Sequence, residues 1–261
     1  MTGPIGLHGG GEFFAGDEPF LDALLTAAAS AARSRADASD DVAGHSLEES
    51  APALRIAIVP TAAARGRPDL AAATGRAAFE RRAASLGLRV TVEVARIVDA
   101  ASAADPRETA PIAAADLVHL PGGDPDLIPA ILAGTPALEA LLMASGRGAV
   151  VAGASAGAMA LAEWTWTPGG GIRGLGLVCG LAVVPHYDDV RRTRWQEQLD
   201  ELAPGGIGYL GLDERTGVLS WPRSPAGWAW RVVGEGVVSW FARGAAEPVI
   251  ARHGDVLALP G

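Results

Sequence analysis

The segment Gly153-Ala154-Ser155-Ala156-Gly157 restricts the fold more than any other stretch of the sequence. An apolar run, 148–154, precedes the serine, and small residues compatible with a helix follow it at 156–162. A chain that turns at once from strand into helix forces the turning residue into a sparsely allowed conformation, and small neighbours relieve the crowding. The segment therefore predicts a strand–turn–helix unit with Ser155 as a candidate nucleophile. A buried serine in a tight strand–helix crossing is the alternative.

Most of the remaining sequence alternates short β-branched or leucine-rich runs with longer alanine-rich runs. Strands are expected at residues 4–8, 55–60, 89–94, 116–120 and 149–152, and helices at 69–86, at 136–144 and from residue 18 onward. This alternation predicts an α/β fold with a mostly parallel central sheet, covered by helices on both faces. After Tyr209 the pattern changes to short apolar runs separated by glycines. We expect these to form antiparallel C-terminal strands.

A single domain of residues 1–261 fits this length, and 49% hydrophobic residues allow a substantial core. Residues 29–53 differ from the rest, because they are rich in alanine, serine and acidic residues and have no clear period. We expect them to form the end of a helix and a mobile surface insertion within the domain.

The composition also excludes several classes of function. A net charge of −9 argues against a nucleic-acid partner, which would need a basic face. The longest uncharged apolar stretch, 148–162, is shorter than the roughly 20 residues of a membrane helix. The single cysteine, Cys179, permits no internal disulfide, and we interpret it as a core residue. Because no secretory signal opens the chain, we expect a soluble, cytoplasmic protein.

Two stretches, one rich in glycine and one in aspartate, partly match cofactor or metal sites. Gly9-Gly10-Gly11 follows the first expected strand, but the dinucleotide fingerprint needs a third glycine where Phe14 stands. Asp124 and Asp126 have no histidine at ligand spacing, and they fit a helix N-terminus better. We therefore expect neither a cofactor nor a metal.

A serine nucleophile needs a base, and the chain has five histidines. Three of them, His8, His119 and His186, follow short apolar runs at expected strand ends, where open α/β sheets place their ligands. His186 comes after the serine, as in many α/β hydrolases, and is our candidate base. A structural histidine is the alternative for each of the three.

Four stretches occur in this order: HLPGGDPDLI (119–128), GTPALEALLMASGRGAVVAGASAGAMAL (134–161), GLGLVCGLAVVPHYD (174–188) and YLGLDERTGVL (209–219). Together they resemble the dipeptidase E and cyanophycinase family of serine peptidases. The resemblance implies the fold of class I glutamine amidotransferases, a flavodoxin-like three-layer sandwich. It implies Ser155 as nucleophile and His186 as base, with the backbone amides of Gly123 and Ala156 as oxyanion donors.

The acidic member of the triad is open. The window in which the best-known relatives carry an acid falls here on 170–173, which holds none. Asp188 is our preferred residue, because side chains two apart on a strand point to the same side. Glu163, Glu214 and Glu12 are the alternatives, and Asp188 has the alternative role of capping a helix that begins near residue 190.

The resemblance also indicates the class of substrate. Cyanophycinases follow their histidine with arginines that hold an aspartyl-arginine side chain, and the spacing matches here at Arg192. Arg192 is therefore a candidate substrate contact, although it also fits the solvated face of a helix. The other candidate contacts are Asp124 and Glu12. We expect a serine peptidase that cleaves short aspartyl or isoaspartyl peptides, or a related acidic small molecule. A non-catalytic, small-ligand-binding module is the alternative, and a homodimer is left open.

Overall fold

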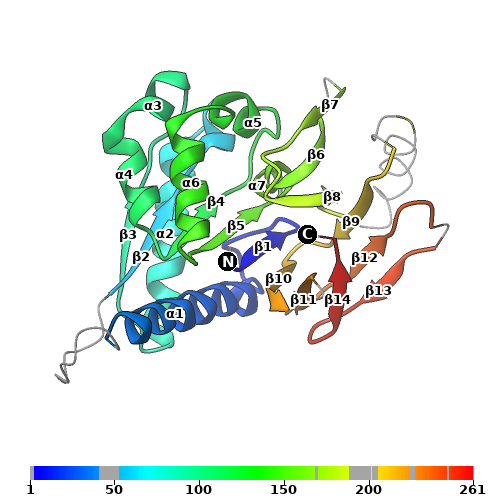
Figure 1. The fold of residues 1–261 in the computed structure, drawn as a ribbon, viewed down its shortest axis with the longest axis horizontal. Helices are drawn as coiled ribbons and strands as arrows, with labels where there is room; N and C mark the ends of the chain where they lie inside the picture. Colours follow the sequence, from blue (N-terminus) through cyan, green and yellow to red (C-terminus); the bar gives the residue numbers. More distant parts are fainter. Residues whose placement is uncertain are drawn as a thin grey trace.

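A computed structural model describes residues 3–40, 53–167, 170–187, 201, 205–223, 227–245 and 247–260 (Figure 1). Its centre is an eight-stranded sheet in the order β14-β11-β10-β1-β5-β4-β2-β3. Five neighbouring strands run parallel: β1 (Ile5–His8), β5 (Val150–Ala154), β4 (Leu117–Leu120), β2 (Leu54–Ile58) and β3 (Val90–Val94). The antiparallel strands β10 (Thr216–Arg223), β11 (Gly227–Gly234) and β14 (Val256–Leu259) extend the sheet beyond β1. The expected mostly parallel sheet with antiparallel C-terminal strands is confirmed.

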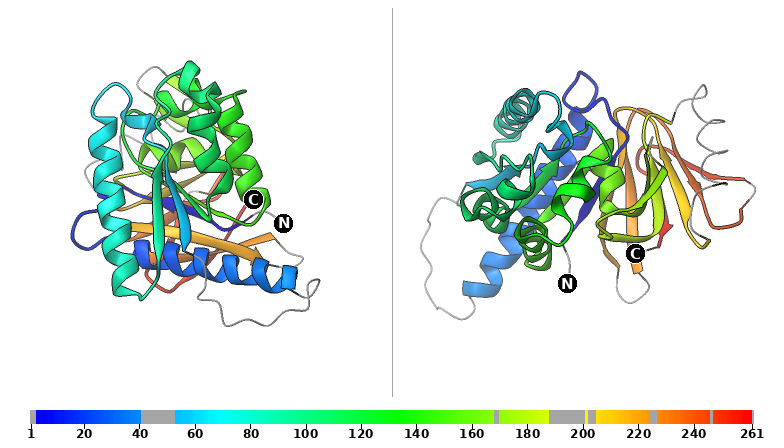
Figure 2. Two further views of the ribbon diagram at one scale, coloured as in Figure 1. Left: turned by 90° about the vertical axis from the view of Figure 1, so that its left-hand side faces the viewer. Right: turned by 90° about the horizontal axis from the view of Figure 1, so that it is seen from above.

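Helices cover both faces of the parallel strands, as Figures 1 and 2 show. The helices are α1 (Glu18–Asp40), α2 (Pro68–Ser85), α3 (Ala100–Ala104), α4 (Pro106–Ala114), α5 (Leu127–Leu132), α6 (Pro136–Gly146) and α7 (Ala156–Leu161), with a short 3₁₀ turn at Thr61–Ala63. Alternate residues of β5 enter different cores: Val150 packs in the cluster that includes α1 and α2, and Val151 packs in the cluster that includes α4 and α6. This period of two is expected for a strand buried on both faces.

A second, six-stranded sheet, which the sequence analysis did not anticipate, lies beside the first. Its order is β13-β12-β9-β8-β6-β7. The strands are β6 (Ala162–Thr167), β7 (Gly170–Arg173), β8 (Val178–Val184), β9 (Gly208–Leu212), β12 (Val238–Phe241) and β13 (Val249–Ala251). One continuous hydrophobic cluster contains residues of both sheets, among them Leu7, Val151, Leu181 and Leu210. The helix α7 joins the sheets, because it follows β5 of the first and leads directly into β6 of the second.

The helix α1 continues to Asp40, and residues 41–52 of the expected insertion lie outside the described residues. Glu163 lies in β6, where the alternating Glu-Trp-Thr-Trp-Thr sequence favours a strand. The expectation for Cys179 needs correction. Cys179 is exposed rather than in the core, since it follows buried Val178 on β8 and therefore points to the other face.

Among the described residues, no helix has the length and apolarity needed to cross a bilayer. The described histidines, cysteines and acidic residues also form no group of three or more that could hold a metal ion.

Candidate active site

Ser155 stands at the sharp turn between β5 and α7, as the flanking glycines predict. Its backbone has φ 49° and ψ −113°, a conformation that residues with a side chain rarely adopt. The turn is tight: a Cβ on Gly153 would lie 2.3 Å from the backbone carbon of Gly157, and a Cβ on Gly157 would lie 2.0 Å from the carbonyl oxygen of Leu120. The Ser155 amide donates to the His8 carbonyl at 2.9 Å, so neighbouring β1 holds the turn.

His186 approaches Ser155 from the second sheet. It follows the end of β8 and has φ 51°, and its amide donates to the Gly9 carbonyl at 2.8 Å. Nε2 of His186 lies 3.0 Å from Oγ of Ser155, which is hydrogen-bonding distance. The structure thus brings together the serine and the histidine that the sequence analysis selected, from strand ends of two different sheets.

The carboxylate next to the imidazole is that of Glu214. Its Oε1 lies 2.8 Å from Nδ1 of His186, and Glu214 belongs to the short turn between β9 and β10. Glu163 is elsewhere and accepts a hydrogen bond from the Gly180 amide, and the preferred Asp188 lies outside the described residues. The preference for Asp188 requires His186 to lie in a strand, because only then do side chains two apart point to the same side. His186 instead lies beyond the end of β8 and has a positive φ.

The triad-like row is open to solvent at one end. The His186 side chain is 29% exposed and that of Glu214 is 50% exposed. Solvent therefore screens the charge of Glu214. The main contribution that this geometry allows the Glu214 carboxylate is to orient the imidazole and fix the ring's tautomer. With the proton on Nδ1 facing the carboxylate, Nε2 is free to accept the proton of the Ser155 hydroxyl.

Residues 9–16, here called the glycine loop, pack against the imidazole. A Cβ on Gly10 would lie 2.3 Å from Cε1 of His186 and 2.7 Å from its Nε2, so only glycine leaves room for the ring. Gly10 also has φ 106°, and its carbonyl accepts from the Arg215 amide at 2.8 Å. The three glycines after β1 do not fit a nucleotide-binding motif, and Glu12 was the candidate site residue of this loop. The sequence carries no signal for the contact between Gly10 and the imidazole.

A second loop, residues 121–124, passes beside Ser155. A Cβ on Gly122 would lie 3.2 Å from Cβ of Ser155, and the Gly122 amide donates to Oε1 of Glu12 at 2.8 Å. Glu12 therefore ties the glycine loop to this one. Gly123 has φ 152° and fits closely over the backbone of Ala62, so a side chain there would collide with it.

The amides of Gly123 and Ala156 are the two donors that the resemblance implies for an oxyanion. Among the described residues neither amide has a hydrogen-bond partner. Asp124, a candidate substrate contact, instead caps the following turn through the Asp126 amide and pairs with Arg65 at 3.0 Å. The other candidate, Arg192, lies outside the described residues.

The histidines at the two other expected strand ends are both buried. Burial, with a smaller contribution from the nearby His8, lowers the pKa of His119 to about 3, so His119 is neutral. Its ring packs against Phe13 and Phe79. His119 is therefore a structural side chain, and His8 belongs to a polar cluster beneath the glycine loop.

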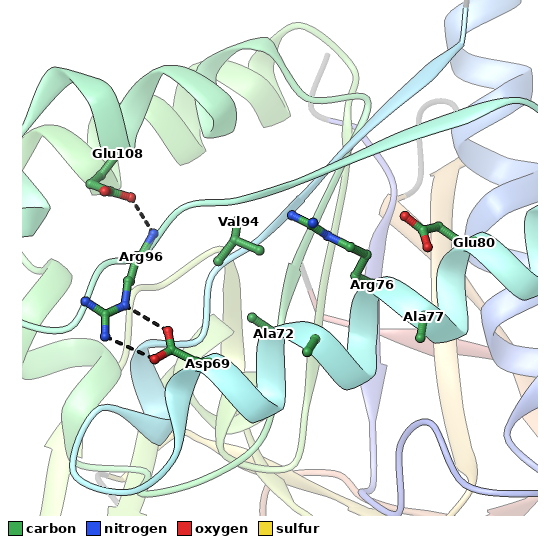
Figure 3. A pocket seen from close by; sticks show the side chains of 9 residues that line it. Asp69, Ala72, Arg76, Ala77, Glu80, Val94, Arg96 and Glu108 are labelled. Atoms are coloured by element: carbon green, nitrogen blue, oxygen red, sulfur yellow. Dashed lines mark hydrogen bonds and ion pairs between the residues drawn. The ribbon is translucent and has the colours of Figure 1, made fainter.

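Figure 3 shows a separate cleft of about 520 Å³ between α2, the edge strand β3 and α4. In this cleft the Arg96 guanidinium binds Asp69, and the Arg96 amide donates to Glu108. The hydrogen bond from Arg96 lowers the pKa of the Asp69 carboxyl. Because β3 stands three strands away from β5, this cleft is remote from Ser155.

Comparison with known proteins identifies the family and the fold of the chain. The model of peptidase family S51 matches residues 25–219. The crystal structure of a peptidase from an acI-B1 actinobacterium matches with a TM-score of 0.73 and 23% identity, over 99% of this chain and 98% of that one. A putative peptidase E protein from Listeria monocytogenes EGD-e matches with a TM-score of 0.49 and 17% identity, over 97% and 99%. No curated protein matches. The actinobacterial structure shows a shared fold, and the family match shows that this chain belongs to peptidase family S51, the dipeptidase E family of serine peptidases.

Proposed function

We propose that the chain cleaves short peptides by nucleophilic catalysis at Ser155. Oγ attacks the scissile carbonyl carbon while Nε2 of His186 takes the hydroxyl proton. The imidazolium then gives this proton to the leaving amine, the C–N bond breaks, and an acyl-enzyme remains. Water attacks the ester carbonyl and loses a proton to Nε2, which returns it to Oγ as the acid product leaves.

One observation carries this proposal: Oγ of Ser155, the two ring nitrogens of His186 and Oε1 of Glu214 form one row, with contacts of 3.0 and 2.8 Å. A nucleophile in reach of a base that is itself oriented by a carboxylate is the arrangement such catalysis needs. The amides of Gly123 and Ala156, which have no hydrogen-bond partner among the described residues, support it, since Gly123 lies on the loop beside Ser155 and Ala156 follows the serine at the start of α7.

The proposed substrates are short aspartyl or isoaspartyl peptides, a class that the resemblance to dipeptidase E and the cyanophycinases suggests. A cation adjoins the loop of residues 121–124: Arg65 is 71% exposed and contacts Asp124 with one guanidinium nitrogen. A guanidinium with free donors binds a carboxylate through charge-assisted hydrogen bonds. We therefore assign Arg65 to the acidic side chain of the substrate.

Hydrolysis of a matched dipeptide panel tests both parts. Asp-Leu, isoAsp-Leu, Asn-Leu and Ala-Leu are incubated with the wild type and Ser155→Ala, and products are measured by mass spectrometry. We expect the wild type to cleave Asp-Leu and isoAsp-Leu faster than Asn-Leu and Ala-Leu, and we expect Ser155→Ala to cleave none of the four. Arg65→Gln is expected to raise KM for them about tenfold, the loss of one charge-assisted contact, with little change for Ala-Leu. Equal cleavage of all four peptides would contradict the substrate class, and cleavage by Ser155→Ala would contradict the mechanism.

The alternative of a non-catalytic binding module rested on the missing acid after the serine. Because the Glu214 carboxylate lies at Nδ1 of His186, the missing acid after the serine no longer favours that alternative. No observation on the described residues favours the module.

A further inference from the structure

A second histidine–carboxylate pair lies buried behind the glycine loop. His8 and Asp17 are each 1% exposed, and Nε2 of His8 lies 3.0 Å from Oδ1 of Asp17. The two atoms are close, although their angle is poor for a hydrogen bond, and neither has another partner among the described residues. Burying Nε2 and Oδ1 without a well-formed hydrogen bond costs free energy, which other contacts of the two side chains must offset.

Both side chains also bind the backbone of the glycine loop. Nδ1 of His8 accepts from the Gly10 amide at 3.3 Å, and Oδ2 of Asp17 accepts from the Phe13 amide at 2.8 Å. Because a backbone amide can only donate, Nδ1 of His8 carries no proton, and the ring proton of the neutral imidazole sits on Nε2 toward Asp17. The pair thus holds the loop at two points.

The opposite side of the same loop contacts the candidate base. The position of a Gly10 Cβ is 2.3 Å from the His186 ring, and the Gly9 carbonyl accepts the His186 amide. The backbone of His8 meanwhile accepts the Ser155 amide at 2.9 Å. A displacement of Gly10 therefore moves the wall against which the imidazole rests, while the serine stays bound to β1.

We infer that His8 and Asp17 are positioning residues, which hold the glycine loop so that Gly10 keeps the His186 ring in line with Ser155. Neither side chain touches the substrate in this account. The inference rests on the proposed function, because it assigns the ring of His186 to proton transfer.

Asp17→Asn tests the inference with a minimal change. The carboxylate faces two donors, the Phe13 amide and Nε2–H of His8, whereas an asparagine offers one oxygen and one NH₂ group, so one donor must lose its acceptor. We expect the second-order rate of fluorophosphonate labelling to fall about tenfold or more, since errors of about 1 Å in a reacting group cost up to 10²-fold. Asp22→Asn is the matched control, because Asp22 lies near the start of α1 and, among the described residues, pairs with Arg82.

A purely structural pair gives a different result. It would lower the Tm of Asp17→Asn but leave the labelling rate of the folded protein, checked by circular dichroism, equal to that of Asp22→Asn. A comparison at His8 adds a rescue: His8→Asn keeps an acceptor near the Gly10 amide, so we expect it to label faster than His8→Leu. Equal rates for these two variants would overturn the inference.

One measurement needs neither a variant nor activity. We expect the Gly10 amide of the wild type to exchange slowly with deuterium, because His8 accepts its hydrogen bond in a buried setting. Exchange as fast as at an exposed loop amide would contradict the inference even if the variants fail to fold. If instead the wild type is not labelled while Gly10 is protected, the proposed function fails and the loop contact stands.

Discussion

Substituting Gly10 by alanine tests how the glycine loop controls the catalytic geometry. The new Cβ would stand 2.3 Å from Cε1, 2.7 Å from Nε2 and 2.9 Å from Nδ1 of His186. Carbon atoms in favourable contact are about 3.5–4.0 Å apart, so the ring or the loop must move by about 1 Å or more. The contact between Nε2 and Oγ of Ser155, now 3.0 Å, would then be lengthened or misaligned.

The size of the effect follows from this displacement. A misplacement of about 1 Å costs on the order of 10²-fold in rate, which corresponds to about 2.7 kcal/mol in the activation barrier. Stability falls as well, because Gly10 has φ 106° and a side chain in that region costs about 1–3 kcal/mol. We therefore expect Gly10→Ala to lose about 100-fold in kcat/KM and to melt at a lower temperature.

The assay is the rate of fluorophosphonate labelling, measured below the Tm of every variant. Gly254→Ala is the control: Gly254 has φ 90°, stands in the turn between β13 and β14, and has no atom within 4 Å of its would-be Cβ. It carries comparable backbone strain without a clash, so its rate should equal the wild-type rate. A folded Gly10→Ala protein that labels within about twofold of Gly254→Ala would refute the reasoning.

Three further predictions concern single side chains. Glu214→Gln should lower kcat by about 10²-fold or more with little change in KM, because the amide NH₂ can face Nδ1 of His186 and favour the wrong imidazole tautomer; an unchanged kcat would exclude Glu214 from the triad. Glu12→Ala should lower kcat about tenfold by freeing the Gly122 amide, whereas Glu12→Gln, which keeps an acceptor, should not; equal kcat values would argue against this link. The pKa of His119 is about 3 in the folded protein, compared with about 6.5 for a free histidine. The free energy of unfolding should therefore decrease as the pH falls from 6.5 toward 3, by up to about 1.4 kcal/mol per pH unit. In urea titrations His119→Phe should remove this slope, and a variant of the exposed His253 should keep it.

The parallel part of the fold could be predicted from sequence because its signals are local. Apolar runs mark β1, β2, β4 and β5, and Gly153 is required by a contact within one strand–turn–helix unit. Gly157, by contrast, is required by its contact with Leu120 of β4. The start of α4 had a local signal as well, since Asp105 caps it and Pro106 occupies its first turn, but the prediction omitted it. The alternating Trp and Thr residues of β6 were a similar missed signal.

The acid and the glycine loop could not be predicted in this way. Glu214 is 28 residues from His186, and the two meet only because β8 and β9 pair and both strands end at the same edge. The strand rule that favoured Asp188 fails at His186, whose positive φ takes the chain out of the strand. The contact of Gly10 with the imidazole depends on the placement of two sheets, for which a single sequence carries no periodic signal.

The central claim is that Ser155 is an activated nucleophile. The most direct test is to label the wild type and Ser155→Ala with a fluorophosphonate and to map the adduct by mass spectrometry. The account predicts one adduct on the wild type, on the peptide that contains Ser155, and none on a folded Ser155→Ala protein. An adduct that persists in Ser155→Ala, or a wild type that acquires none while it hydrolyses peptides, would contradict it.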